Sequence, residues 1–197
     1  MSATQLSLLE PVAALPEGFV YRPDLVAPEQ EIELIGRFRE LDFREFEFQG
    51  YLGKRRVVSF GLHYDFAERR VRDAAEIPAF LLPLRDRAAG FAGIASAALE
   101  HALVTEYTAG AAIGWHRDRP VFGDVVGISF GSSCRFRFRR KQGSGWERTS
   151  VLLEPRSADL LRGAARHQWE HSIPPAEDLR YSVTFRRVKP SAASAGR

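Results

Sequence analysis

The chain has 197 residues, 45% of them hydrophobic and 27% charged, which is the composition of an ordinary globular protein rather than a disordered or fibrous one. Its length suits one well-packed domain, and no apolar run approaches the roughly 18 residues that a membrane span needs. The single cysteine, Cys134, excludes an internal disulfide and a cysteine zinc site. Because the N-terminus also lacks the basic start and apolar core of a secretory signal, we expect a cytoplasmic protein.

The net charge of +3 is unevenly distributed along the chain. From residue 112 onward basic side chains outnumber acidic ones two to one, whereas acidic side chains predominate before it. Only Lys54, Lys141 and Lys189 are lysines, and the arginines that supply the other positive charges suit bidentate recognition of carboxylates or phosphates. The pattern suits an anionic ligand, and it equally suits a solvated arginine-rich surface.

Helical patterns are confined to the first half of the chain. Three prolines in the first two dozen residues predict a loose arm. Pro28, followed by Glu29 and Glu31, predicts a helix start, because proline and carboxylates suit the first helical turn. Apolar residues then recur at helical spacing over 32–41. A second segment, 78–99, is rich in alanine and leucine and is expected to break into two pieces at its prolines and glycines.

Elsewhere in the chain, apolar and polar residues alternate as in β-strands. This alternation occurs at 45–48 and 57–60, and a dense series of short strands follows from His101 to Arg187. We therefore predict a mainly β protein with flanking helices (α+β), built as a sandwich or barrel behind a helical layer in one structural domain. Within it, residues 1–100 are expected to form the arm, lid strands and supporting helices, 101–188 the barrel core, and 189–197 a flexible tail.

One pair of side chains suggests a metal site. His116 and Asp118 are two residues apart, so on a strand both point to the same side. Such a pair is often just a surface pair, but His171 follows 53 residues later, a separation that lets several strands fold back. Two histidines and one carboxylate form the facial triad of non-haem Fe(II) oxygenases. His167 competes with His171 for the third position.

A second constellation lies in the last strand, 180–186. Its even positions, Arg180, Ser182, Thr184 and Arg186, share one face, and apolar residues occupy the other. If the polar face points into a barrel, its two guanidinium groups form a cavity for an anion rather than a packed core. If it points outward, it is an ordinary solvated sheet surface.

These motifs together resemble a known family. The sequence His116-Arg-Asp, then His171-Ser-Ile-Pro-Pro, then Arg-Tyr-Ser-Val-Thr-Phe-Arg at 180–186, preceded by Leu-Val-Thr-Glu-Tyr-Thr-Ala-Gly at 103–110, resembles the AlkB-like branch of the 2-oxoglutarate and Fe(II) dependent dioxygenases. The resemblance spans about residues 102–187. It implies a double-stranded β-helix, or jelly roll, with the metal inside one open end.

The resemblance also implies roles for individual residues. It implies that the iron ligands are His116, Asp118 and His171. His171 is preferred over His167 because the family's distal histidine is followed by an Ile-x-Pro motif. It implies that Arg180, Arg186 and Tyr107 bind the cosubstrate. Thr105 and Ser182 are implied to do the same, at positions where repair-type members usually carry amide residues.

The implied reaction oxidises an unactivated C–H bond with Fe(II), 2-oxoglutarate and O₂. When the target is an N-methyl group, the hydroxymethyl product releases formaldehyde. Alkylated DNA or RNA is the partner expected first, yet Pro120 stands where repair-type members tend to carry an acidic, base-reading residue. A protein or small-molecule substrate is therefore an alternative, and a non-catalytic barrel that binds nucleic acid or a partner is a third. The oligomeric state is open, with a monomer as the default expectation.

Candidate substrate contacts lie in two places. The segment 46–66 mixes aromatic and basic residues, and Tyr51, Tyr64 and Phe66 are candidates for stacking on a base, although packing of the helical layer would also use them. In the run 135–139, arginine alternates with phenylalanine, so the phenylalanines should face the core. Arg135 and Arg137 could then track a phosphate backbone or simply be solvated.

Two tryptophans adjoin the metal motifs. Trp115 precedes the first histidine, and Trp169 lies two residues before His171. We expect both to wall the cavity or to pack beneath it.

Overall fold

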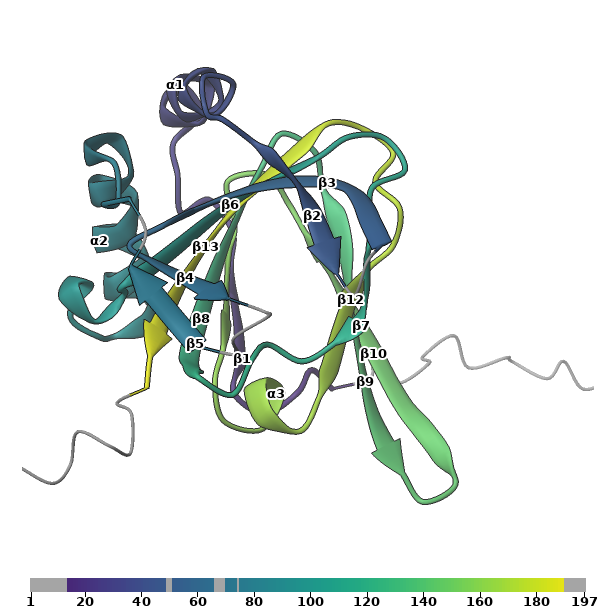
Figure 1. Ribbon diagram of the computed structural model, residues 1–197. Helices are drawn as coiled ribbons and strands as arrows, with labels where there is room; N and C mark the ends of the chain where they lie inside the picture. Colours follow the sequence, from purple (N-terminus) through teal and green to yellow (C-terminus); the bar gives the residue numbers. More distant parts are fainter. Residues whose placement is uncertain (1–13, 49–50, 66–69, 74, 190–197) are drawn as a thin grey trace, which may run out of the picture.

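Two antiparallel sheets face each other in the computed structural model, which describes residues 14–48, 51–65, 70–73 and 75–189 (Figure 1). The seven-stranded sheet has the order β1-β11-β8-β13-β6-β3-β2, and the four-stranded sheet has the order β10-β9-β12-β7. This is the double-stranded β-helix that the sequence predicts, because strands consecutive in the chain repeatedly cross from one sheet to the other.

The strands of the larger sheet are, in sheet order, β1 (Phe19–Arg22), β11 (Ala158–Leu161), β8 (Phe122–Phe130), β13 (Arg180–Val188), β6 (His101–Tyr107), β3 (Tyr51–Phe60) and β2 (Arg44–Phe48). Those of the smaller sheet are β10 (Gly145–Leu153), β9 (Cys134–Gln142), β12 (Glu170–Ile173) and β7 (Ile113–His116). A separate hairpin pairs β4 (Leu62–Asp65) with β5 (Arg70–Asp73).

The helices are α1 (Pro28–Phe38), α2 (Leu82–Ala92) and the short α3 (Gly163–His167), with single 3-10 turns at Ala79–Leu81 and Ser96–Ala98. As predicted, α1 begins at Pro28 with two glutamates in its first turn. Its apolar stripe differs in one place, because Ile32 is 75% exposed while Phe38 is fully buried. The expected break in the second segment occurs at Gly93, which ends α2 with a φ of 66°.

Two apolar clusters hold these layers together. The first joins α1 and α2 to the outer face of the larger sheet and includes Phe38, Leu84, Val183 and Phe185. The second lies between the two sheets and includes the buried Phe136, Phe138 and Trp169. The odd positions of β13 thus pack under the helices, so its even positions point into the barrel.

The first hundred residues do more than cover the barrel. Part of the predicted loose arm is in fact β1, an edge strand that pairs with β11 through four residues, because its alternating side chains can pack against the core. Strands β2 and β3 also join the larger sheet. Residues 1–13 of the arm and 190–197 of the predicted tail lie outside the described residues. None of the described helices combines the length and the apolar character needed to cross a membrane.

Candidate metal and cosubstrate site

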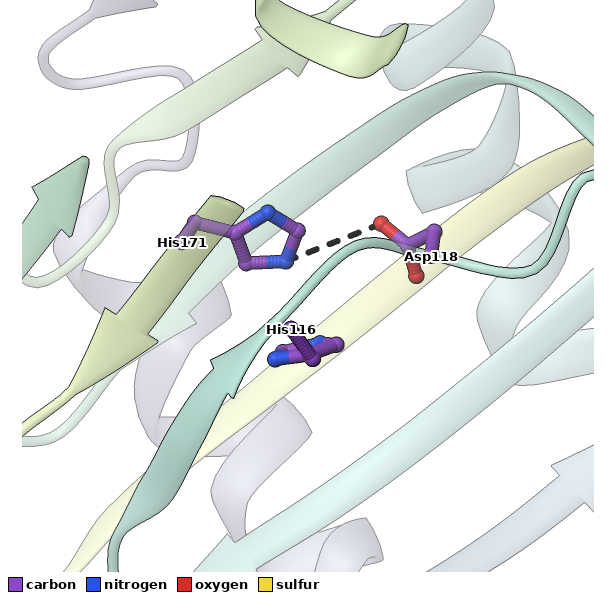
Figure 2. Close-up of side chains that lie close together, drawn as sticks. All are labelled: His116, Asp118 and His171. Carbon is purple, nitrogen blue, oxygen red and sulfur yellow. Dashed lines mark ion pairs between the residues drawn. The ribbon is translucent and has the colours of Figure 1, made fainter. Parts of the chain in front are cut away.

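Strand pairing brings the two histidines together. His116 at the end of β7 lies directly opposite His171 on β12, and their ring centroids are 4.3 Å apart. Asp118 follows in the loop after β7, with its Oδ2 3.7 Å from His171 Nε2 (Figure 2). One potential ligand atom from each of the three residues lies within 4.8 Å of the others. Antiparallel pairing in the smaller sheet therefore brings together two histidines that are 55 residues apart in the chain.

The environment of this cluster keeps the histidines neutral and the carboxylate charged. Burial, reinforced by the neighbouring His116, lowers the pKa of His171 to about 3, and burial also lowers the pKa of His116. Burial alone would raise the pKa of Asp118, but nearby positive charge, chiefly that of Arg186, outweighs burial and holds that pKa well below its usual range. Neutral imidazoles and an ionised carboxylate are the forms that ligate a metal ion.

Hydrogen bonding orients the first histidine. His116 Nδ1 lies 2.9 Å from the carbonyl oxygen of Gly114, and a proton on Nδ1 would leave the Nε2 lone pair as the ligand. His167, the alternative to His171, is exposed at the end of α3 rather than on a strand. Of the two histidines, the structure therefore brings His171 and not His167 into the cluster.

The two arginines of β13 share one face, as their alternation predicts, and the structure shows that this face points into the barrel. Arg186 Nη2 lies 3.3 Å from Asp118 Oδ1, and its Nη1 donates to His101 Nδ1 at 3.3 Å. Arg180 Nη2 donates to Ser129 Oγ at 2.8 Å. Arg180 Nε and Nη1 and Arg186 Nε are buried and find no acceptor among the residues that the structure describes.

A cavity of about 80 Å³ joins the two constellations. His116, Asp118 and His171 line it together with both arginines. The remaining polar lining includes Tyr107, Ser182, Ser129, Thr184 and Asp159.

The other predicted cosubstrate residues divide into those that line the cavity and one that does not. The Tyr107 hydroxyl lies 3.5 Å from Ser182 Oγ, and the Arg180 guanidinium lies 4.7 Å from the centroid of the Tyr107 ring. Thr105 is buried opposite Ser182 in the sheet but does not line the cavity.

The donor set fits iron and a dicarboxylate. Two imidazoles and one carboxylate on one side of an ion leave its other positions open, as non-haem Fe(II) oxygenases require. The buried N–H groups of Arg180 that lack an acceptor could donate to one carboxylate of 2-oxoglutarate. The cavity therefore offers both a metal site and an anion site, which is the combination that this cosubstrate needs.

Two buried residues of this region escape sequence-based prediction. Asp159 on β11 lines the cavity and is 7% exposed. Arg166 on α3, 3% exposed, donates to the carbonyl oxygens of Asp118, Arg119, Phe122 and Gly123 at 2.6–3.1 Å, so it holds the loop that carries the aspartate. The only sequence signal for either is a charged residue inside an otherwise apolar or small-residue stretch.

Of the predicted substrate residues, the two whose side chains the structure describes, Arg135 and Arg137, do not line the cavity. Arg135 and Arg137 lie on the outer face of β9, because Phe136 and Phe138 occupy the inner face as expected. Tyr51 and Tyr64 are on β3 and β4, but their side chains are not described, and Phe66 lies outside the described residues.

The two tryptophans behave differently from each other. Trp169 is buried in the cluster between the sheets, as predicted. Trp115 does not wall the cavity: it alternates with His116 on β7 and so faces outward, where the guanidinium groups of Arg137 and Arg139 lie 5.1 and 4.6 Å from its ring centroid.

Comparisons with known proteins identify the family that this chain resembles. The model of the 2OG-Fe(II) oxygenase superfamily matches residues 18–188. The chain is 30% identical over 193 residues to an Arabidopsis thaliana protein named "Alkylated DNA repair protein ALKBH8 homolog", covering 86% of this chain and 54% of that protein. It is 29% identical over 99 residues to the uncharacterized protein L905 of Acanthamoeba polyphaga mimivirus, covering 44% of this chain and 47% of that one.

A solved structure titled "The structure of OsALKBH1" superposes with a TM-score of 0.68 at 17% identity, covering 90% of this chain and all of that one, and so shares its fold. The chain spans about half the length of the curated relatives it matches. Its enzymatic class follows from the family match, which covers most of the chain, and its cofactor and cosubstrates are Fe(II), 2-oxoglutarate and O₂. The chain belongs to the 2OG-Fe(II) oxygenase superfamily and resembles AlkB homologues in sequence and in fold.

Proposed function

We propose that this enzyme removes alkyl groups from the bases of DNA or RNA, with succinate, CO₂ and, for a methyl group, formaldehyde as products. The name of the Arabidopsis relative supports a nucleic-acid substrate. The observation that carries the proposal is a cationic and aromatic surface on the outer face of the smaller sheet, which we call the Arg–Trp face.

The Arg–Trp face is a stack of cations and indoles. Arg139 lies between two tryptophans, with its guanidinium carbon 4.6 Å from the ring centroid of Trp115 and 4.3 Å from that of Trp146. Lys141 also contacts Trp146, with its Nζ 5.4 Å from the ring centroid. The exposed Arg135 and Arg148 extend the positive charge along the same side of β9 and β10, and the β9–β10 hairpin projects beyond the body of the barrel (Figure 1).

Such a surface suits a single strand of nucleic acid. Guanidinium groups bind phosphates, and exposed aromatic rings stack on bases of any sequence. Glu170, which pairs with Arg139 at 2.6 Å, is the one carboxylate on this face of the described part of β9, β10 and β12, so the net charge is strongly positive. In this proposal Arg135 and Arg137 contact the phosphate backbone while the alkylated base enters the cavity.

Inside the cavity, we assign the Fe(II) ligands to His116, Asp118 and His171. Arg180, with Tyr107 and Ser182 beside it, would hold the distal carboxylate of 2-oxoglutarate, and Arg186 orients Asp118 through its contact at 3.3 Å. When bound, iron and its cosubstrates supply an oxidant that hydroxylates a C–H bond. The protein supplies the ligand geometry, a largely buried site and the position of the substrate.

A protein or small-molecule substrate is the second candidate, and Pro120 favours it. This residue lies exposed in the loop two positions after Asp118, where it offers no carboxylate to pair with a base. A cytoplasmic location and a monomeric state remain part of the proposal as expectations from the sequence.

A substrate panel tests the proposal. The enzyme, loaded with Fe(II) and 2-oxoglutarate, is incubated with N-methylated single-stranded DNA, duplex DNA and RNA and with an N-methylated peptide, and loss of the methyl group is followed by mass spectrometry. We expect demethylation of at least one nucleic acid and none of the peptide. Demethylation of the peptide alone would overturn the nucleic-acid proposal in favour of the second candidate.

A further inference from the structure

Asp159 lines the cosubstrate cavity and fills a space that a neighbouring glycine leaves open. Its cross-strand partner on β8 is Gly127, and a Cβ added there would lie 2.6 Å from Asp159 Oδ1. The absence of a side chain at Gly127 therefore creates the space that the carboxyl group fills. No hydrogen bond or ion pair reaches this carboxyl from the described residues, although it is 7% exposed and shares the cavity with Arg180.

Charged and titratable groups near Asp159 lie on β13, β9, β1 and the loop after β7, whereas its partner on β8 is Gly127. Arg180 approaches from β13 and Asp118 from the loop after β7, and their charges act on Asp159 in opposite directions. Cys134 at the start of β9 is within electrostatic reach, and burial raises the pKa of this thiol, so it stays neutral. Tyr21 is the cross-strand partner on β1, and its hydroxyl accepts the backbone N–H of Glu154. Arg180 is thus the cation that faces this carboxyl.

One guanidinium cannot neutralise two carboxylates. When a carboxylate of 2-oxoglutarate occupies the open N–H groups of Arg180, an ionised Asp159 would leave a second negative charge in a small, mostly buried cavity. Like charges in one site raise the pKa of the group that can still accept a proton, and an unpaired buried charge is costly. A neutral Asp159 carboxyl avoids the repulsion and can donate a hydrogen bond.

We propose that Asp159 takes up one proton from solvent when 2-oxoglutarate binds, and that its neutral carboxyl then helps to hold the carboxylate bound by Arg180. This inference rests on the proposed function only in assigning Arg180 to the cosubstrate. The proton joins one carboxylate oxygen of Asp159 on binding and returns to solvent when the dicarboxylate product leaves. Asp159 is therefore a specificity-determining residue that couples cosubstrate affinity to pH.

The direction of the coupling follows from the free protein. Burial raises the pKa of Asp159 to about 6, with Arg180 opposing the rise, so at neutral pH the carboxyl of the free protein is mainly ionised. Above pH 6, binding must bring in a proton, and affinity should fall about tenfold for each further pH unit. Below pH 6 the proton is already present, and the affinity should depend little on this group.

Isothermal titration calorimetry tests the inference directly. We would titrate 2-oxoglutarate into the protein saturated with Mn(II), which replaces Fe(II) so that no turnover occurs, between pH 6 and pH 8. For the wild type we expect an affinity about tenfold weaker at pH 8 than at pH 7, and uptake of about one proton at pH 8 when buffers of different ionisation enthalpy are compared. For Asp159→Asn we expect a weak pH dependence and no such proton uptake.

Two further variants make the outcome decisive. Asp124→Asn removes a carboxylate that pairs with Arg162 at 3.0 Å outside the cavity lining and should keep the wild-type pH slope. An unchanged slope in Asp159→Asn, or equal weakening at every pH, would overturn the inference. Arg180→Gln separates the two proposals: if it binds 2-oxoglutarate like the wild type, the assignment of Arg180 fails, whereas if it loses binding and Asp159→Asn changes nothing, only the role of Asp159 fails.

Discussion

At the scale of single residues, the site depends on histidines that are held neutral next to a carboxylate that is held charged. His116 and His171 have lowered pKa values because they are buried, and Asp118 stays ionised because nearby positive charge, chiefly that of Arg186, outweighs the effect of burial. These protonation states suit metal binding, because a metal ion needs deprotonated ligands and would place its positive charge beside the buried carboxylate.

Removal of one ligand should therefore abolish the metal and cosubstrate complex. We expect the anaerobic addition of Fe(II) and 2-oxoglutarate to give a visible charge-transfer absorption in the wild type and none in His116→Ala or Asp118→Ala. His167→Ala is the matched control, because that histidine is exposed and four residues from His171. Loss of the band in the control but not in the ligand variants would contradict the assignment.

The ionised carboxylate of Asp159 should also destabilise the free protein at neutral pH. Its pKa rises from an ordinary value of 3.8 to about 6 in the folded state, so its stabilising contribution is complete below pH 3.8 and is lost as pH rises through 6. We expect Asp159→Asn to raise the free energy of unfolding by up to about 3 kcal/mol at pH 7 relative to its effect at pH 4. Urea unfolding at the two pH values measures this, and an equal effect at both would show that the folded protein does not shift this carboxyl.

At the scale of elements, α3 acts as a clamp on the loop between β7 and β8. The Arg166 guanidinium binds four backbone carbonyl groups of residues 118–123, and β12 begins shortly after the same helix. Because α3 binds the backbone of Asp118 and lies shortly before His171 in the chain, we expect it to support the positions of both residues.

Loosening this clamp should weaken the metal site without removing a ligand. We expect Arg166→Met to lower metal affinity by roughly 10–100-fold, the range seen when partners that orient ligands are lost, with a smaller effect on 2-oxoglutarate affinity once metal is saturating. Arg117→Met is the control, since Arg117 is exposed and makes one long contact of 3.4 Å with the His167 carbonyl. Equal metal affinity in Arg166→Met and the wild type, measured by competition with a chromophoric chelator, would show that the clamp does not support the metal site.

Local periodicity explains which elements can be predicted from the sequence. Alternation depends on neighbouring residues alone, so it correctly places Arg180 and Arg186 on one face of β13 and Phe136 and Phe138 on the inner face of β9. The start of α1 at Pro28 is equally local. These features need no knowledge of the remainder of the fold.

Features that depend on pairing between distant strands cannot be predicted in this way. The sequence predicts a loose arm where β1 lies, because these four residues form a strand only through β11, nearly 140 positions away. It predicts Trp115 at the cavity because this residue adjoins His116, whereas the stack that holds the indole comes from β9. Asp159 and Arg166 gain their significance from Gly127 and from the loop after β7, which no short motif reveals.

At the scale of the whole molecule, the smaller sheet presents two chemically different faces. Its inner face contributes both histidines to the cavity, and its outer face is the Arg–Trp face. A single strand of nucleic acid bound along the outer face could pass around an end of the four-stranded sheet to reach the cavity. Substrate binding and catalysis would then use opposite faces of the same sheet.

Charge reversal on the outer face should then weaken substrate binding without touching the chemistry. We expect Arg135→Glu with Arg137→Glu to lower the affinity for a single-stranded oligonucleotide and to reduce the slope of log K against log salt by about one for each phosphate that the variant no longer binds. Turnover of 2-oxoglutarate without nucleic acid should stay unchanged. Arg37→Glu with Arg39→Glu, which makes the same charge change on and just after α1, is the control, and an equal effect in both double variants would attribute the result to net charge alone.

We propose that oxidation in this site is directed at an alkylated base, and the ratio of formaldehyde to succinate formed with an N-methylated single-stranded oligonucleotide tests this claim. Coupled demethylation predicts a ratio near one for the wild type, with both products lost in Asp118→Ala. Succinate without formaldehyde on methylated DNA and RNA alike would show a working oxygenase with a different substrate and would contradict the claim.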